Sequence, residues 1–126
     1  ILRYNQIQSI DPFAFVDLYS LNNLSLANNH IEDLTSRHFQ SLTQLIELDL
    51  SSNRIDQLNG SIFDNLTSLQ VLRLNRNPLT HIDPHSFTNL TYLKELHLQD
   101  LNLLERIYDD DFQRWTRSTF SSVEER

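Results

Sequence analysis

Leucines and other apolar residues recur along this chain with a period of 24 residues. Leucine stands at positions 21, 45, 69 and 93, and each opens a run in which the first, fourth and sixth places are leucine. The eleventh and fourteenth places are isoleucine or leucine, and the twenty-second is leucine. The ninth place is asparagine and the nineteenth phenylalanine, at Asn5, Asn29, Asn53 and Asn77 and at Phe15, Phe39, Phe63 and Phe87. A repeat of this length predicts stacked coils, each burying its apolar face against the next.

Each period predicts one short strand. Leu24 and Leu26 flank a polar residue, and this alternation is typical of a strand with one buried face. Strands that recur at equivalent places run parallel, about 4.8 Å apart, and the wider return segments cannot match that spacing. We therefore expect an α/β solenoid, a curved coil with short parallel strands on its concave face and irregular turns or short helical turns on its convex face. Asp11–Pro12 and Asp83–Pro84 begin two of these convex turns.

The asparagines and phenylalanines have separate predicted roles. Each asparagine stands where the chain leaves a strand, and its carboxamide can both donate to and accept from buried backbone groups of adjacent coils. We expect these side chains to form a ladder along the solenoid. The phenylalanines are expected to stack on the convex side, where the pattern predicts no sheet.

The repeat pattern covers residues 1–115. We divide it into a partial repeat 1–20, full repeats 21–44, 45–68 and 69–92, and a variant repeat 93–117 with one residue inserted after Leu98. Residues 118–126 are either a polar tail or an improvised cap built on Trp115, Phe120 and Val123. Because Ile1 and Leu2 enter in mid-repeat, we expect a piece of a longer solenoid, with the coil at Leu21 half covered and uncapped ends that favour self-association.

Composition excludes several classes of site. The chain has no cysteine and one glycine, Gly60, which rules out disulfides, thiolate metal sites and glycine-rich phosphate loops. Its net charge of −7 argues against nucleic acid and anionic membranes as main partners. No apolar run approaches the roughly 18 residues of a membrane span.

The run LxxLxLxxNxIxxLxxxxFxxLxx resembles the leucine-rich repeat, in the 24-residue typical class of animal extracellular proteins. Such repeats are found in Toll-like receptors, adhesion proteins and small proteoglycans. The resemblance implies a solenoid that binds proteins outside the cell. The cysteine-rich caps of those families are missing from this sequence.

The resemblance places the candidate partner-binding residues at the exposed places of the predicted strands. They are Tyr4, Asn23, Ser25, Glu47, Asp49, Val71, Arg73, Arg76, Glu95 and His97. Tyrosine and arginine are frequent at interface centres. The alternative is a plain solvated face, and Asp49 beside Arg73 on the neighbouring strand is expected to form a solvated pair of little energy.

Four N-x-[ST] sequences are candidate glycosylation sites, at Asn23, Asn59, Asn65 and Asn89. They favour an extracellular or cell-surface location. Asn23 discriminates between binding modes, because a glycan there would obstruct the concave face and move a partner to the sides.

We expect neither catalysis, a cofactor nor a metal in this segment. Nearly every apolar residue belongs to the repeat core, and no nucleophile, base and acid converge on a pocket. The acidic turn Asp109–Asp111, near Glu105, is interpreted as solvated rather than as a calcium site. The histidines occupy five different places in the repeat.

The sequence thus favours a protein-interaction module from the ectodomain of a cell-surface receptor, of innate immune or adhesion type. Its partner would be a protein ligand or co-receptor, with no nucleic acid and no membrane insertion of this segment. The alternatives are an internal spacer of a longer secreted or adhesion solenoid, and a targeting domain attached to an enzyme or G-protein-coupled receptor.

Overall fold

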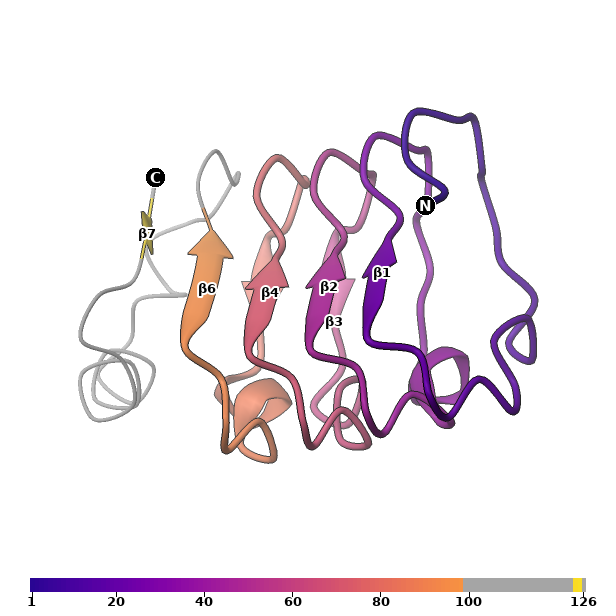
Figure 1. Cartoon of the computed structure of the whole chain (residues 1–126). Helices are drawn as coiled ribbons and strands as arrows, with labels where there is room; N and C mark the ends of the chain where they lie inside the picture. The colour runs from indigo at the N-terminus through magenta and orange to yellow at the C-terminus, as the bar shows by residue number, and fades with distance from the viewer. Residues whose placement is uncertain (99–123, 126) are drawn as a thin grey trace.

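The computed structural model describes residues 1–98, 124 and 125. Within these residues the chain winds into successive coils that lie side by side, each contributing one strand to a common sheet (Figure 1). The strands are β1 (Asn23–Ser25), β2 (Glu47–Asp49), β4 (Val71–Arg73), β6 (Glu95–Leu98) and β7 (Glu124–Glu125). They pair in parallel in the order β1-β2-β4-β6-β7. The predicted solenoid with a parallel sheet is confirmed.

The register of the first four strands follows the sequence repeat. Leu24 pairs with Leu48, Leu48 with Leu72, and Leu72 with Leu96. All four side chains are buried, so their strand neighbours face outward. Residues 118–126 were assigned to a polar tail or cap, and within them Glu124–Glu125 add a strand to the edge of the sheet beside β6.

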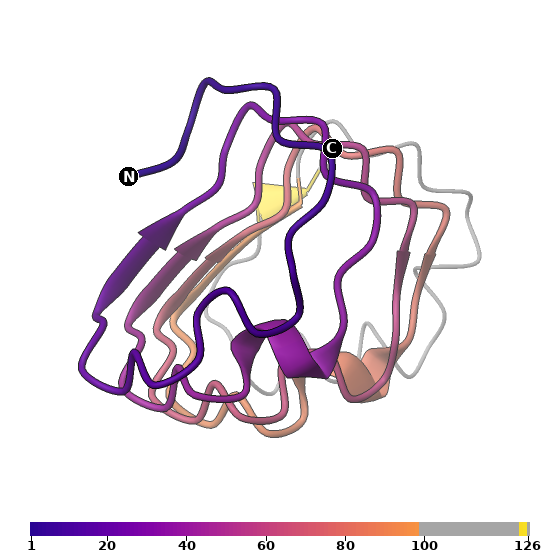
Figure 2. The same ribbon diagram turned by 90° about the vertical axis from the view of Figure 1, so that its right-hand side faces the viewer.

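The opposite side of the solenoid carries short helical turns and a second, smaller sheet (Figure 2). The 3-10 helices η1 (Ser36–Phe39) and η2 (Pro84–Phe87) agree with the predicted helical turns. The expectation that this side has no sheet is wrong, because β3 (Gln57–Leu58) and β5 (His81–Ile82) pair in parallel. These segments repeat every 24 residues like the main strands, so the same register brings their backbones together.

Phenylalanines fill the space between the two sides of the coil. The Phe39 and Phe63 ring centroids are 6.0 Å apart, those of Phe63 and Phe87 are 6.2 Å apart, and all three residues are almost fully buried. The predicted column is therefore present from Phe39 onward. Phe15 is buried but makes no aromatic ring contact with the described residues. Its coil differs from the others, with Asp17 held at a φ of 66°.

The asparagine ladder connects each coil to the next. Asn53 Nδ2 donates to the carbonyl oxygens of Leu26 (2.9 Å), Leu50 (3.1 Å) and Ser51 (3.2 Å), while its Oδ1 accepts from Ile31 N at 3.1 Å. Asn29 and Asn77 repeat this arrangement, and all three are buried. One side chain thus hydrogen-bonds backbone groups of two coils, at the turn where the chain leaves its strand.

The first coil departs from two expectations. Asn5 is exposed and donates only locally, to Leu2 O and Arg3 O, because no coil lies on its outer side in this structure. For the same reason Leu18, at a predicted core place, is 43% exposed. The coil at Leu21 is better covered than expected, since Leu24 and Leu26 are buried. The first residues provide that cover and hydrogen-bond to its backbone, for example through Leu2 N and Ser25 O at 3.0 Å.

Some predictions fall outside the described residues. They concern the variant repeat beyond Leu98, Glu105, the acidic turn Asp109–Asp111, and the capping residues Trp115, Phe120 and Val123. In the part that is described, no helix has the length and apolar character needed to cross a bilayer.

The ladder makes a quantitative prediction. Replacing Asn53 with alanine leaves buried carbonyl and amide groups unsatisfied, and we expect the free energy of unfolding to fall by about 3 kcal/mol. Asn5→Ala is the matched control, because Asn5 is exposed and bonds only within its own coil. We expect it to cost less than about 1 kcal/mol. Urea unfolding of the full chain measures both, and equal losses for the two variants would contradict a ladder that connects coils.

Candidate partner-binding surface

Two rows of side chains line the outer face of the parallel sheet. The third-place row contains Asn23, Glu47, Val71 and Glu95, and the fifth-place row contains Ser25, Asp49, Arg73 and His97. Within each row, residues on neighbouring strands are register partners. The structure therefore brings together eight of the ten predicted binding residues on one face.

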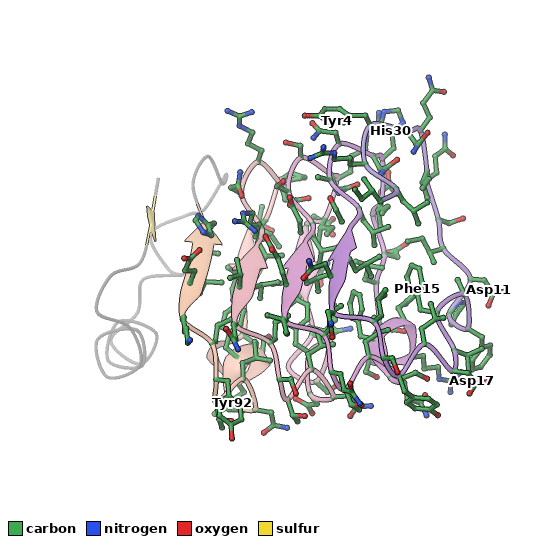
Figure 3. All side chains as sticks on the ribbon, in the orientation of Figure 1. Tyr4, Asp11, Phe15, Asp17, His30 and Tyr92 are labelled. Atoms are coloured by element: carbon green, nitrogen blue, oxygen red, sulfur yellow. The ribbon has the colours of Figure 1, made fainter. Side chains whose placement is uncertain are left out.

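Tyr4 and Arg76, the other two, lie on bends just beyond the strands. Both have a left-handed backbone with φ near 60°, and so do Asn28 and Ser52, which share the eighth place of the repeat. Figure 3 shows Tyr4 and His30 at the same edge of the molecule. Tyr4 is 72% exposed, and the Arg3 guanidinium lies 5.7 Å from its ring centroid. These residues extend the sheet face along its edge.

The expected pair between Asp49 and Arg73 is not formed, although the two are register partners. Arg73 Nη1 instead binds the Glu47 carboxylate, one row away on the neighbouring strand. Asp49 Oδ1 accepts from the backbone N of Ser51 at 3.0 Å and from its hydroxyl at 2.6 Å. This local turn occupies the Asp49 carboxylate, so the guanidinium pairs with the other acid within reach.

Two further features mark the fifth-place row. His97 Nε2 lies 3.2 Å from Glu95 Oε2. The hydroxyl of Ser25 is buried and has no hydrogen-bond partner among the described residues. Burying a hydroxyl without a hydrogen-bond partner costs free energy, and no contact among the described residues explains why a serine occupies this position.

Apolar side chains are also exposed at the lower margin of the sheet. Ile46 precedes β2 and is 37% exposed, and Tyr92 is 66% exposed. Tyr92 lies at the edge opposite Tyr4 and His30 (Figure 3). Exposed tyrosine and isoleucine beside a polar sheet are typical anchors of interfaces. Tyr92 directly precedes the first leucine of a repeat, and Ile46 directly follows one. These positions in the repeat were the sequence signal that could have identified them.

All four asparagines of the N-x-[ST] sequences are exposed. Asn23 opens β1 on the sheet face, as expected. Asn65 Nδ2 donates to Gln40 O at 3.3 Å, and Asn89 holds the equivalent place in the next coil. Glycosylation at these positions remains a prediction.

One histidine has a structural role that the sequence did not indicate. His38 is buried, its Nδ1 accepts from Thr35 N at 3.0 Å, and its Nε2 donates to Ile10 O at 2.8 Å. It thereby connects the first two coils. Over the residues placed by the structure, no three histidine or acidic side chains are grouped as they would be around a metal ion.

Comparison with known proteins identifies the family. A leucine-rich repeat family model matches residues 1–55 and 43–104, so the chain belongs to the leucine-rich repeat family. Leucine-rich repeat proteins of the Toll-like type are among those that it resembles. Among curated proteins, none matches this sequence significantly.

Three solved structures illustrate the similarity. A chain in the structure of the TLR13–ssRNA13 complex is 32% identical to this chain in sequence, with a TM-score of 0.85 over 98% of this chain. The glycosylated Toll–Spatzle complex of Drosophila is 30% identical with a TM-score of 0.78 over 81%. The APL1 leucine-rich repeat domain is 31% identical with a TM-score of 0.77 over 81%. The present chain spans only 17%, 14% and 27% of those chains, respectively.

The charge pairing on the sheet face is testable with double-mutant cycles. We expect a coupling free energy of about 0.5 kcal/mol between Glu47 and Arg73, since both side chains are about one-third exposed and water screens the pair. The coupling should decrease when salt is added. A parallel cycle on Asp49 and Arg73 is the control and should give a coupling near zero. A larger coupling in the second cycle would contradict the observed pairing.

Proposed function

We propose that this chain is a protein-recognition module, part of the ectodomain of an extracellular or cell-surface receptor of innate immune or adhesion type. The observation that carries this proposal is the pair of aligned rows on the parallel sheet. Their backbones are fixed by hydrogen bonds and buried leucines, while the side chains between those leucines face outward. Such a surface presents chemically varied side chains on a backbone that loses little further conformational entropy when a partner binds.

The balance of charges supports a protein partner. Glu47, Asp49 and Glu95 alternate with Arg73 and His97 on the sheet face, and the whole chain carries −7. A mixed surface of this kind suits the polar groups of a folded protein better than a uniformly charged polymer. The Toll structure contains the protein Spatzle, which agrees with this choice.

Nucleic acid is the second candidate, and one observation favours it. The TLR13 structure, which matches 98% of this chain, contains a single-stranded RNA. Negative charge over the whole chain is therefore not sufficient to exclude nucleic acid, contrary to the interpretation of the sequence. A catalytic role is not proposed, because the apolar residues fill the interior and the candidate residues lie on an open sheet.

The proposal is tested with variants in which lysine replaces one exposed glutamate, so that the charge at that position is reversed. The immobilised chain is used to capture extracellular proteins, which are identified and produced separately. Each is then titrated against the chain and its variants, and single-stranded RNA is titrated in parallel. Glu95→Lys alters the sheet face, whereas Glu32→Lys, also exposed and outside the strands, is the matched control. We expect about tenfold weaker binding of the same protein for Glu95→Lys, about 1.4 kcal/mol, and no change for Glu32→Lys. Equal effects of the two variants, or binding of RNA alone, would overturn the proposal.

The use of Asn23 as a glycan acceptor gives an independent test. Docking on the sheet face requires the Asn23 side chain to remain unmodified in the secreted chain, because it opens the third-place row. The measurement is the mass of the peptide containing Asn23 before and after enzymatic deglycosylation, with the Asn65 and Asn89 peptides as positive controls. A mass shift at Asn23 would place the partner on the sides of the solenoid instead.

A further inference from the structure

The single glycine of this chain, Gly60, follows an asparagine at the start of a convex turn. Asn59 holds the fifteenth place of its repeat. The same place is occupied by Asp11, Thr35 and Asp83 in the other described coils. All three residue types are common at the first position of turns and helices, where their side chains accept from backbone N–H groups.

Asn59 does not use its side chain in this way. Asp11 accepts from Phe13 N at 2.8 Å, and Asp83 accepts from His85 N at 2.9 Å. The exposed carboxamide of Asn59 makes no hydrogen bond to any residue that the structure describes, and residues 60–65 form turns rather than a 3-10 helix. Its backbone oxygen, in contrast, accepts from Ile62 N at 3.2 Å and from Ser86 Oγ at 3.0 Å.

A close contact with the next coil explains the glycine. A Cβ added to Gly60 would lie 3.1 Å from Asp83 Oδ2. The Asp83 carboxylate is held in place by His85 N through its other oxygen, so it cannot easily move away. The backbone N of Gly60 makes no hydrogen bond within the described part of the chain. Packing therefore leaves a free carboxamide next to an unhindered, unbonded peptide nitrogen.

We propose that Asn59–Gly60 is a site of spontaneous covalent modification through a cyclic imide. The peptide nitrogen of Gly60 attacks Cγ of Asn59, a C–N bond forms, and Nδ2 leaves as ammonia with the proton that the peptide nitrogen gives up. Water then opens the five-membered ring at either carbonyl, which yields aspartate or isoaspartate at position 59. No oxidation or reduction takes place, and water is the only co-reactant.

Asn59 is the one asparagine of this sequence that precedes a glycine, and the structure protects several of the others. Asn29, Asn53 and Asn77 are buried, and their carboxamides are occupied in the ladder. Asn65 is exposed, but its Nδ2 donates to Gln40 O and the residue after it is leucine, whose side chain hinders the approach of the peptide nitrogen.

The two products change the turn in different ways. An aspartate at position 59 gains a carboxylate that can accept from the backbone two residues on, as Asp11 and Asp83 do. An isoaspartate adds one carbon to the main chain directly after β3, where the Asn59 oxygen binds Ser86 of the next coil. A sugar on Nδ2 would block the reaction, because that nitrogen is the leaving group.

The test uses the full chain produced without glycosylation and incubated at mildly alkaline pH. Trypsin cleavage after Arg54 and Arg73 releases residues 55–73, a single peptide that contains both Asn59 and Asn65. Mass spectrometry of this peptide, with the unincubated chain as baseline, measures conversion at the two sites separately. We expect Asn59 to convert at least about tenfold faster than Asn65, which corresponds to a barrier lower by about 1.4 kcal/mol. Isoaspartate is identified by enzymatic methylation.

Variants keep the proposal falsifiable. Gly60→Ala should slow the conversion by about tenfold, a barrier change of about 1.4 kcal/mol. The Cβ of Gly60→Ala would press on Asp83, so a second variant is needed. Asn59→Gln should abolish the product, because glutamine cannot form the five-membered ring. Asn65→Gln is the matched control and should leave conversion at Asn59 unchanged. Equal conversion at Asn59 and Asn65, or conversion at Asn59 in the synthetic 55–73 peptide but not in the folded chain, would overturn the proposal.

Discussion

Each coil leaves its strand through a turn that is buried against the next coil, and the backbone groups of that turn have no strand to pair with. The carboxamides of Asn29, Asn53 and Asn77 satisfy them, donating to carbonyl groups of their own and the preceding coil and accepting from an amide of the preceding coil. Without this arrangement, a turn of this kind would bury unpaired polar groups at a cost of about 1–3 kcal/mol each. The spacing of the coils, and with it the parallel sheet, depends on this interaction.

That constraint decides where function can be located. The leucines and the Phe39–Phe63–Phe87 column fill the interior, so chemically varied residues are left to the outer face and the turns. On the sheet face, several polar side chains find partners nearby, such as Arg73 with Glu47 and His97 with Glu95. A partner must therefore compete with or complete these contacts, which favours recognition by shape and local charge pattern over long-range attraction.

The sequence predicted the interior of the solenoid well, because each core position packs against equivalent residues in every repeat and therefore keeps the same residue type. It was less successful where those neighbours are missing or where side-chain conformation decides. Asn5 and Leu18 have core residue types but lie in a coil that no other described residues cover on its outer side, so they are exposed. The register correctly placed Asp49 beside Arg73, but the turn at Ser51 occupies the carboxylate. The left-handed eighth place carries Tyr, Asn, Ser and Arg, which share no sequence signal for that conformation.

Hydrogen exchange at two backbone amides tests the ladder most directly. Ile31 N and Ile55 N lie outside the strands and donate to the side-chain oxygens of Asn53 and Asn77 at 3.1 Å. The account predicts that both amides exchange as slowly as those of Leu48 and Leu72 in the centre of the sheet, since all of them open only when the coils separate. Exchange at the rate of the exposed turn amides would show that the asparagines do not hold the coils together.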